Sequence, residues 1–563
     1  MTKLHNILLV LLVCTFTQAV IPQTNFYVKP VSTGDSSGTS WANAATLNAV
    51  LNSAASNDVI HLAAGTYTPS ILITNGIDLY DMTFEIKNNI SLIGGYPKDP
   101  NELDVPSNEN QTILNGEIEQ GYNAYHVVAI TAPSINGQKV SVENIIITGG
   151  NAASSGDDIT INALSFKRIV GAAVTVGNSK VDIKNCTITD NHSQGGTPGL
   201  FAFSNADISI ENTDFINNIG TGSTGNGASL WIDESTIRVN NSNFIGNKNS
   251  GVGAIHLTNY SKAAFYNSTI AFNVSGFNNT VDTRNGSGIY IRNGSQAQVV
   301  NCTMYGNISN GSSAGIALHA YDDYFGTSVD IISSTIVKNN ALMQNNATAG
   351  VCALTGGCTV SIYNSIITDN TAVGLQDYNL TVAAGTVLMH KKSIVGENIY
   401  DNSENIISDI KFIPEGMLDY LRDNGGRSET VQLLLEDVSN PAKQYGMSAT
   451  ELSLLGESLI PSIPDEIMTY DQLGNKRTGN IMGALTANIS NVQQQKIYDF
   501  KIYARGNTLY IENQGVKLIQ VFDAIGQRIA SLQPHGDVTT ICNLCKGHIY
   551  IVNVDNESTK IIL

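Results

Sequence analysis

Apolar and polar residues alternate over short stretches in the middle of the chain, and the stretches recur within one eleven-residue phrase. The first clear copy reads VDIKNCTITDN, and its apolar residues at every second position predict a half-buried strand. Successive copies start 26 to 34 residues apart, at Val181, Ile208, Ile237, Ala263, Ala297, Val329 and Val360, after an earlier relative at Val140. A repeat of this length predicts a solenoid whose units stack to share one core.

Each phrase also carries asparagine at two fixed positions, where Ser333 is the one substitute. Asparagine tolerates left-handed backbone, and its amide can bond the equivalent amides above and below it in stacked coils. A third strand precedes each phrase and usually opens with glycine. The predicted ladder comprises Asn185, Asn212, Asn241, Asn267, Asn301 and Asn364 at the first position, and Asn191, Asn218, Asn247, Asn273, Asn307, Asn339 and Asn370 at the second.

Three short strands per coil with asparagine at the corners predict an all-β fold, a right-handed parallel β-helix. Its clear coils span about residues 86–395. The alternative is a sandwich of antiparallel hairpins rich in Ser, Thr and Asn. Hairpins do not keep one phrase in register over eight turns, so the β-helix is favoured.

Composition agrees with this fold. The chain has 563 residues with 51 glycines, 13 prolines and 14% charged residues, which suits buried strands joined by tight turns. The net charge of −18 argues against nucleic acid or an anionic membrane surface as partner. Bound Ca²⁺ would reverse that argument locally.

The amino terminus predicts export. Lys3 and His5 precede the short apolar run ILLVLLVC, so we expect a signal peptide over residues 1–19 with cleavage near Ala19. Cys14 is a poor match to a lipoprotein box. Because no other stretch is long and apolar enough to be a transmembrane segment, we expect a secreted protein at the outer-membrane surface or in the extracellular space.

The other six cysteines leave alternatives open. Cys186 and Cys302 occupy one repeat slot four coils apart and are predicted to be small buried hydrophobes. Cys352 and Cys358 flank LTGG and are candidates for a disulfide in an oxidising compartment. For Cys542 and Cys545, in CNLC, a disulfide or two free thiols is favoured over a zinc or redox site.

Both flanks of the repeats resemble one protein family. ATLNAVLNSAA has helical spacing and is predicted to cap the open end of the β-helix. That segment, SLIGGYPKDP, and the later LRDNGGRSETVQLLL and TYDQLGNKRTGNIMGAL are similar to bacterial surface β-helix proteins of the pectin-lyase-like superfamily and to polymorphic outer-membrane proteins. The resemblance supports one capped β-helix domain over residues 25–490 and says almost nothing about activity.

A change in composition marks a linker over residues 491–497, and residues 498–563 predict a small antiparallel β-sandwich. VFDAIGQRI, KGHIYIVNVD and the terminal TKIIL resemble the C-terminal sorting domain of the type IX secretion system. The alternative is an ordinary β-sandwich binding module. The resemblance implies the type IX secretion machinery as a partner, followed by attachment to the cell surface or release.

The sequence contains only partial matches to known catalytic motifs. NTD at residues 212–214 and GDD at 156–158 resemble the carboxylates of polygalacturonases, but their order is reversed and the His-Gly and Arg-Ile-Lys partners of those enzymes are missing. The repeats show no carboxylate cluster of the kind that holds Ca²⁺ in pectate lyases, and no nucleophile elbow. We therefore assign no catalytic residue, no metal site and no cofactor, and expect Ca²⁺ only if an enzymatic alternative holds.

A candidate binding surface comes from the strand before each phrase. Counting outward positions from its opening glycine predicts one column of Trp231, Thr258, Arg292 and His319, and another of Ser229, His256, Tyr290 and Ala317. The inserted loop AYDDYFGTS (320–328) would wall a groove beside them. Aromatic rings flanked by His, Arg and Asp suit sugar stacking and hydroxyl recognition. The candidate binding residues are Trp231, Asp233, His256, Tyr290, Arg292, His319, Tyr321, Asp322, Asp323 and Tyr324.

The sequence therefore predicts a surface-displayed β-helix without catalysis that binds glycans or mediates adhesion to polysaccharide or a host surface. A polysaccharide lyase or glycoside hydrolase on the same scaffold is the alternative, and a purely structural spacer is the third interpretation. The fold hosts all of them, so it does not choose.

Overall fold

The computed structural model divides into two compact units, Met1–Asn488 and Ile489–Leu563. The first unit is described over residues 23–134, 137–153, 156–222, 226–277, 286–311, 313–321, 324–342, 348–372, 379–396, 418–433, 442 and 445–485. The second is described over residues 500–505, 508–513, 519–523, 528–532, 538–541, 544, 549–554 and 557–562. The predicted signal peptide (1–19) and linker (491–497) lie outside these ranges.

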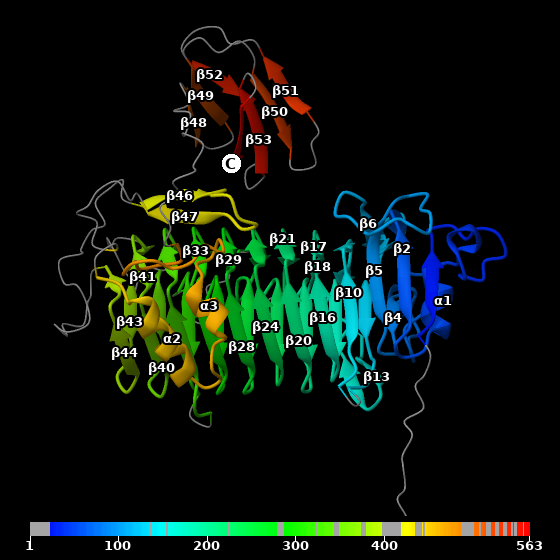
Figure 1. Ribbon diagram of the computed structural model, residues 1–563, viewed down its shortest axis with the longest axis horizontal. Coiled ribbons are helices and arrows are strands. Elements are labelled where there is room, and N and C mark those ends of the chain that lie inside the picture. The colour runs from blue at the N-terminus through cyan, green and yellow to red at the C-terminus, as the bar shows by residue number, and fades with distance from the viewer. Residues whose placement is uncertain are drawn as a thin grey trace, which may run out of the picture. The chain divides into compact units, whose positions relative to one another are not determined.

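Four parallel sheets run along the first unit, and each coil between Val140 and Val382 contributes one strand to each sheet in turn (Figure 1). Sheet I contains β1 (Asn25–Val28), β2 (Val59–Ala63), β5 (Ser91–Tyr96), β10 (Val140–Glu143), β16 (Lys180–Lys184), β20 (Asp207–Glu211), β24 (Thr236–Asn240), β28 (Lys262–Tyr266), β32 (Gln296–Val300), β36 (Ser328–Ile332), β40 (Thr359–Tyr363) and β44 (Val387–Lys391). Sheet II contains β3 (Gly65–Tyr67), β6 (Thr112–Asn115), β11 (Ile146–Thr148), β17 (Thr187–Thr189), β21 (Asp214–Ile216), β25 (Asn243–Ile245), β29 (Thr269–Ala271), β33 (Thr303–Tyr305), β37 (Thr335–Val337), β41 (Ile366–Thr368) and β45 (Ile394–Val395).

The return path of each coil forms the other two sheets. Sheet III contains β12 (Asn151–Ala152), β18 (His192–Ser193), β22 (Ile219–Gly220), β26 (Lys248–Asn249), β30 (Val274–Ser275), β34 (Ile308–Ser309), β38 (Asn340–Ala341) and β42 (Thr371–Ala372). Sheet IV contains β4 (Phe84–Ile86), β9 (Val128–Ile130), β15 (Val174–Gly177), β19 (Leu200–Phe203), β23 (Leu230–Asp233), β27 (Ile255–Thr258), β31 (Ile289–Arg292), β35 (Ile316–His319), β39 (Val351–Ala353) and β43 (Leu380–Val382). The chain is thus a right-handed parallel β-helix, as predicted, with a fourth short strand per coil that the sequence pattern did not reveal.

Two rows of asparagine hold neighbouring coils in register. At the corner between sheets I and II the row has left-handed backbone, as at Asn185 (φ 52°) and Asn212 (φ 50°), and the Asn212 side-chain amide donates to Asn185 Oδ1 (3.1 Å). At the corner between sheets II and III the residue before each asparagine takes the left-handed conformation, while Asn218 and its equivalents point inward and are fully buried. Asparagine side chains thus bond between neighbouring coils at both corners, although Asn267 donates to Asn240 rather than to Asn241.

The amino-terminal end is capped as predicted. Helix α1 (Leu47–Ser53) buries Leu47, Val50 and Leu51 against the first coils. A short 3-10 helix, η1 (Trp41–Asn43), precedes it, and η2 (Leu79–Asp81) lies in the insertion before β4. Two hairpins project from the early coils, β7 (Glu117–Glu119) with β8 (Tyr122–Asn123), and β13 (Ile159–Ile161) with β14 (Leu164–Phe166). No described helix is long and apolar enough to cross a membrane.

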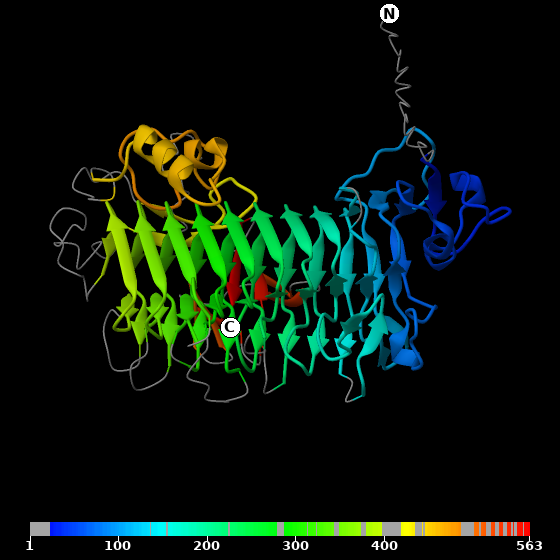
Figure 2. The same ribbon diagram turned by 90° about the horizontal axis from the view of Figure 1, so that it is seen from below.

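The described part of residues 418–485 folds back over the solenoid, and we call it the strap. It contains the hairpin β46 (Leu418–Arg422) with β47 (Thr430–Leu433), and helices α2 (Ala449–Ser458) and α3 (Asp465–Thr469). The helices lie on the outer face of sheet I over the carboxyl-terminal coils, where Leu452 and Met468 pack against Val300 and Ile332 (Figures 1 and 2). The strap therefore closes an apolar face that the coils alone would expose.

The second unit contains two antiparallel sheets. One has β48 (Phe500–Arg505), β49 (Thr508–Asn513) and β52 (Val538–Ile541), and the other has β50 (Ile519–Asp523), β51 (Arg528–Leu532), β53 (Ile549–Val554) and β54 (Glu557–Ile562). Leu509, Val521, Ile541 and Val552 share a buried cluster, which agrees with a small β-sandwich.

Candidate functional site

Six of the ten predicted binding residues lie on successive strands of sheet IV, but in a different register from the one expected. Trp231 pairs with His256, and His256 with Tyr290, whereas we had placed Trp231 beside Thr258. The inward aliphatic residues Leu230 and Ile255 set the register. The opening glycines do not, because they stand at different distances from these residues.

Three of the predicted aromatic residues are not exposed. Trp231, His256 and Tyr290 form a continuous stack on the outer side of sheet IV, and their exposed fractions are 8%, 1% and 1%. The inserted β13–β14 hairpin packs over Trp231, and Val252 and Leu354 pack against Tyr290. The expectation that these rings are open to a sugar is therefore wrong, since the rings stack on one another and apolar residues from other parts of the chain pack against both ends of the stack.

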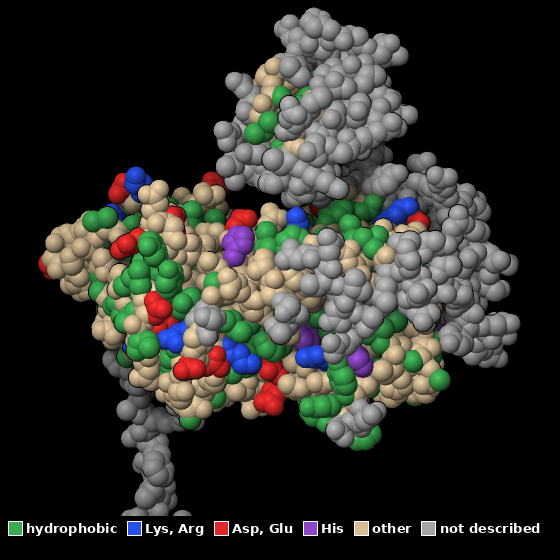
Figure 3. Space-filling model, turned by 180° about the vertical axis from the view of Figure 1, so that it is seen from behind, with side chains coloured by type: hydrophobic (Ala, Val, Ile, Leu, Met, Phe, Trp, Pro, Cys, Tyr) green, Lys and Arg blue, Asp and Glu red, His purple; other side chains and the backbone are tan. Residues whose placement is uncertain are grey.

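The exposed part of the candidate site lies at the corner where sheet IV turns into sheet I. Asp233 pairs with Thr258 across one pair of coils and Arg292 with His319 across another, and Asp233, Arg292 and His319 are each partly exposed. Figure 3 shows acidic, basic and histidine side chains together along the lower border of this rear face. The turns that join each sheet IV strand to the following sheet I strand form a row, which includes residues 233–235, 258–261, 292–295 and the described part of 319–327. We call this row of turns the IV–I corner.

Hydrogen bonds join the polar side chains of the IV–I corner into one network. The Asn259 amide donates to Asp233 Oδ1 (2.7 Å), and the Asn293 amide donates to Asn259 Oδ1 (3.0 Å). Arg292 Nε donates to Thr258 Oγ1 (3.3 Å), which turns the guanidinium back toward the coil of Asp233. Since each group is held by a neighbouring coil, the corner presents fixed donors and acceptors.

Charge and aromatic contacts complete the corner. Burial raises the pKa of Asp233, although the hydrogen bond from Asn259 and the nearby Lys167 and Arg292 oppose that shift. The Lys167 ammonium lies 5.1 Å from the centre of the Trp231 ring, a cation–π contact. Within the described residues the corner therefore combines two carboxylates, Asp233 and Glu234, with two cations.

His319 links the corner to the buried stack. Its Nδ1 shares a hydrogen bond of 3.1 Å with the Tyr290 hydroxyl, and its ring stacks on Tyr321 at 4.1 Å between centres. Tyr324, from the same inserted loop, packs against Tyr260 at 5.6 Å. Asp322 and Asp323 lie outside the described residues.

Sequence reasoning missed Tyr260 and Phe325, whose exposed fractions are 56% and 80%. Both lie at the IV–I corner, in turns rather than in the strand whose alternation guided the prediction. The composition of the turn could have revealed Tyr260. Tyr260 stands where the equivalent turns carry Asn205 and Gly294, and an aromatic residue is out of place there.

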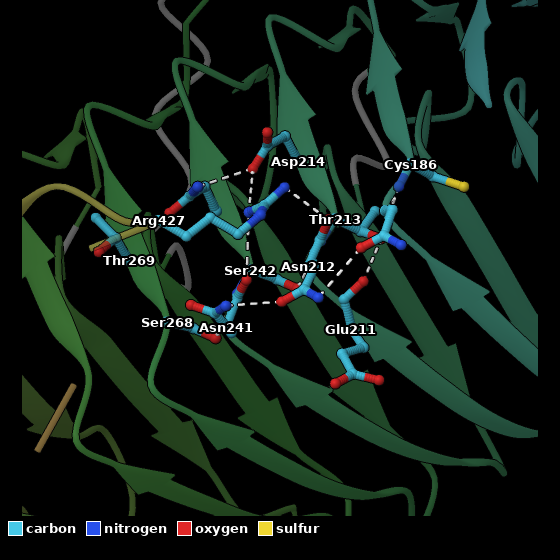
Figure 4. Close-up of polar contacts among 12 residues, drawn as sticks. Cys186, Glu211, Asn212, Thr213, Asp214, Asn241, Ser242, Ser268, Thr269 and Arg427 are labelled. Atoms are coloured by element: carbon cyan, nitrogen blue, oxygen red, sulfur yellow. Dashed lines mark hydrogen bonds and ion pairs between the residues drawn. The ribbon is translucent and has the colours of Figure 1, made fainter. Parts of the chain in front are cut away.

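The NTD motif has a structural explanation (Figure 4). Asp214 pairs with Arg427 of the strap at 2.8 Å and accepts a hydrogen bond from the Asn243 amide (2.8 Å). Arg427 also donates to the backbone carbonyl of Asn212 (2.6 Å). Asp214 thus anchors the strap to the solenoid, a structural role that the sequence analysis did not specify.

The GDD motif at residues 156–158 lies beside the buried pair of Arg168 and Asp81. The Asp157 carbonyl accepts from Arg168 Nη1 (2.5 Å), and Asp158 accepts from the Ser165 hydroxyl (2.7 Å). Within the described residues, no three His, Cys, Asp or Glu side chains are grouped so as to hold a metal ion.

The cysteine predictions have mixed outcomes. Cys186 and Cys302 are buried, as predicted. Cys352 and Cys358 are both free, so the proposed disulfide between them is wrong. Cys352 continues the outward column of sheet IV after Ala317, while Cys358 packs in the core, so their side chains are on different sides of the coil wall. Cys542 and Cys545 lie outside the described residues.

A buried histidine makes the fold sensitive to acid. His126 is 2% exposed, and Nδ1 donates to the Gly171 carbonyl (3.0 Å), while burial lowers its pKa to about 4. Between pH 6.5 and 4 the unfolded chain binds a proton that the folded His126 does not, so stability falls as the pH drops through this window. The expected loss from this residue is about 3 kcal/mol.

Urea denaturation at pH 7, 5.5 and 4 tests this expectation. His126→Gln should show a shallower decline of the free energy of unfolding than the unmodified chain. The matched control is His192→Gln, at an exposed position, which should decline as the unmodified chain does. Parallel declines for all three proteins would contradict the assignment.

Comparisons with known proteins are sparse. No protein-family model matches the chain, and no curated protein matches it. Among solved structures, the chain is similar to pectate lyase Pel9A, at 11% identity and a TM-score of 0.35, over 84% of this chain and 91% of that one. It is also similar to a rhamnogalacturonan lyase, at 16% identity and a TM-score of 0.36, over 68% of this chain and 89% of that one.

Proposed function

We propose that the protein is exported, is displayed at the cell surface, and binds polysaccharide through the IV–I corner without cleaving it. The observation that carries the proposal is the fixed network of Asp233, Asn259, Asn293 and Arg292. Sugar hydroxyls both donate and accept hydrogen bonds, and a pre-ordered set of carboxylate, amide and guanidinium groups meets both needs at low entropic cost.

The chemistry of the corner favours binding over cleavage. Hydrolysis of a glycosidic bond uses two carboxyl groups on opposite sides of the scissile bond. Within the described corner Asp233 belongs to the hydrogen-bond network, and the Asn259 amide already occupies one of its oxygens. Glu234 is the next residue in the same turn and is exposed, so the two carboxyl groups stand side by side in the chain. A lyase or hydrolase remains the alternative, and it makes a different prediction in the same assay.

The export part of the proposal rests on the sequence. The apolar segment before Val20 and the resemblance of residues 498–563 to a type IX sorting domain support it. Protease treatment of intact cells checks this part, because added protease will degrade a protein that is displayed at the cell surface.

Binding can be tested with the full chain on a panel of plant and host polysaccharides, with and without Ca²⁺. We expect retention on at least one polymer, with no shortening of the polymer by mass spectrometry. The double variant Asp233→Asn/Arg292→Met should lose at least tenfold in affinity, since it removes the charged acceptor and the charged donor together.

The matched control is Arg238→Met, which removes an arginine bonded across coils to Asp207 on the outer face of sheet I. It should bind as the unmodified chain does. Shortened polymer would establish the enzymatic alternative. Retention that the double variant leaves intact would place binding elsewhere on the molecule.

A further inference from the structure

Tyr260 has an unfavourable backbone conformation at an exposed corner. Its φ is 59°, in the left-handed region that β-carbon contacts disfavour for most residues. The equivalent residues of other coils are Asn205 (φ 64°) and Gly294 (φ 73°), both of which tolerate this region. A tyrosine at this position carries strain that asparagine or glycine would avoid, and such strain clusters at functional sites.

The neighbouring coil is shaped to receive the Tyr260 ring. A β-carbon at Gly294 would lie 2.4 Å from two carbons of that ring, so only glycine lets the ring lie across the next turn. The Tyr260 backbone N–H donates to the Asn293 carbonyl (2.9 Å), which fixes the direction of the side chain. The ring is therefore held in place, yet 56% of the residue remains exposed.

Two more aromatic residues extend this surface. Tyr324 lies 5.6 Å from Tyr260 between ring centres, at an interplanar angle of 41°. Phe325 is 80% exposed, and its carbonyl lies 2.9 Å from where a β-carbon of Gly294 would be. Tyr260, Tyr324 and Phe325, which we call the aromatic platform, thus reach from the coil of Tyr260 to the inserted loop two coils later. The ring centres of Tyr260 and Tyr324 lie 5.6 Å apart, which suits contact with a single pyranose ring.

Polar groups border the aromatic platform on one side. Asn259 and Asn293, which adjoin Tyr260 and Gly294 in the chain, belong to the same hydrogen-bond network as Asp233. An exposed aromatic ring beside fixed amides matches a pyranose ring whose hydroxyls are equatorial, because that sugar presents C–H groups on its faces and hydroxyls at its rim. The three platform side chains carry no charge at neutral pH. The charged groups beside them balance, since Asp233 and Glu234 lie near Lys167 and Arg292, so the surface favours a neutral sugar.

We propose that the aromatic platform is the principal sugar-stacking subsite, and that it takes neutral, β-linked polysaccharides with equatorial hydroxyls, such as glucan or xylan backbones. This inference rests on the proposed function and names its ligand class. Tyr260 is the residue that determines affinity, because its ring is the one held between two coils.

Calorimetric titration of the full chain with cellohexaose, xylohexaose and polygalacturonate tests the proposal. We expect binding of a neutral oligosaccharide, weakened at least tenfold in Tyr260→Asn and within twofold of the original in Tyr260→Phe, which keeps the ring. Tyr122→Asn, which removes another exposed tyrosine far along the chain, should bind as the unmodified protein does.

The melting temperature separates a binding role from a structural one. Tyr260→Asn restores the residue that Asn205 provides in another coil, so the melting temperature should stay the same or rise while affinity falls. A lower melting temperature with unchanged affinity would overturn the proposal and make the ring a packing element.

The remaining outcomes distinguish this inference from the proposed function. If Tyr260→Asn binds normally while Asp233→Asn/Arg292→Met does not, the platform is not the subsite and the proposed function stands. If the unmodified chain binds only polygalacturonate, the neutral ligand class is wrong and the proposed function again stands. If it binds none of the oligosaccharides and is retained on none of the panel polymers, both fail.

Discussion

Replacing Asn307 by alanine should lower the free energy of unfolding by about 4 kcal/mol, because it removes four buried hydrogen bonds at once. Its Oδ1 accepts from the Asn273 backbone N–H (3.0 Å) and side-chain amide (2.9 Å). Its own amide donates to the Ile270 carbonyl (2.9 Å) and to Asn339 Oδ1 (2.8 Å). Alanine leaves all four partners buried, and water cannot replace the lost bonds. Urea denaturation measures the loss.

The control for Asn307 is the same change at the other asparagine corner. Asn185 is exposed, and its Oδ1 accepts one bond, from the Asn212 amide (3.1 Å). Asn185→Ala should cost about 1 kcal/mol, chiefly because alanine is less tolerant of left-handed backbone. Equal losses at the two positions would show that the inward ladder is no more important than the outward one.

The second large effect is expected at Arg168. Its Nε and Nη2 donate to the two carboxylate oxygens of Asp81 (2.7 and 2.6 Å), and both residues are buried. Burial alone would raise the pKa of Asp81, but the hydrogen bonds from Arg168 and the backbone outweigh it and the pKa is lowered. Arg168→Met should cost about 3 to 5 kcal/mol at pH 7, because it leaves a buried carboxylate without its counter-ion.

Two further measurements check the cause. Asp81→Asn/Arg168→Met should recover part of the stability that Arg168→Met loses. The cost of Arg168→Met should also shrink toward pH 4, because a carboxyl group with lowered pKa contributes its stability above the unfolded pKa and loses it as the pH falls. Arg238→Met, which breaks an exposed pair, should cost below about 1 kcal/mol. A cost that does not change with pH would contradict the ion-pair explanation.

The structural features that recur in every coil could be predicted from the sequence. Asn185 and its equivalents were identifiable because one residue type at one offset meets the same backbone requirement in every coil. Leu47, Val50 and Leu51 were identifiable because helical spacing is local. A structural feature could be predicted from the sequence pattern where its physical cause lies within one coil, or in contacts that are identical between coils.

The site was predicted less well, because its exposure is decided by insertions. Trp231 reads as an outward aromatic residue, and it does point outward, but the β13–β14 hairpin from another coil covers it. Nothing near Trp231 in the sequence encodes that contact. Tyr260 was detectable, since comparing the turns at 204–205, 259–260 and 293–294 shows a bulky residue among turn formers. The strand alternation drew attention away from those turns.

The strap has a consequence for the order in which the molecule is completed. Arg427 reaches Asp214, 213 residues earlier in the chain, and Gln472 donates to Thr269, 203 residues earlier. A chain that emerges amino end first can stack coils as they appear, with each new strand templated by the previous one. Val300 and Ile332 nonetheless stay uncovered until residues 449–469 arrive. During that interval the growing chain exposes an apolar surface that the completed protein buries. An intermediate that stalls at this stage is therefore more prone to aggregation than the mature molecule.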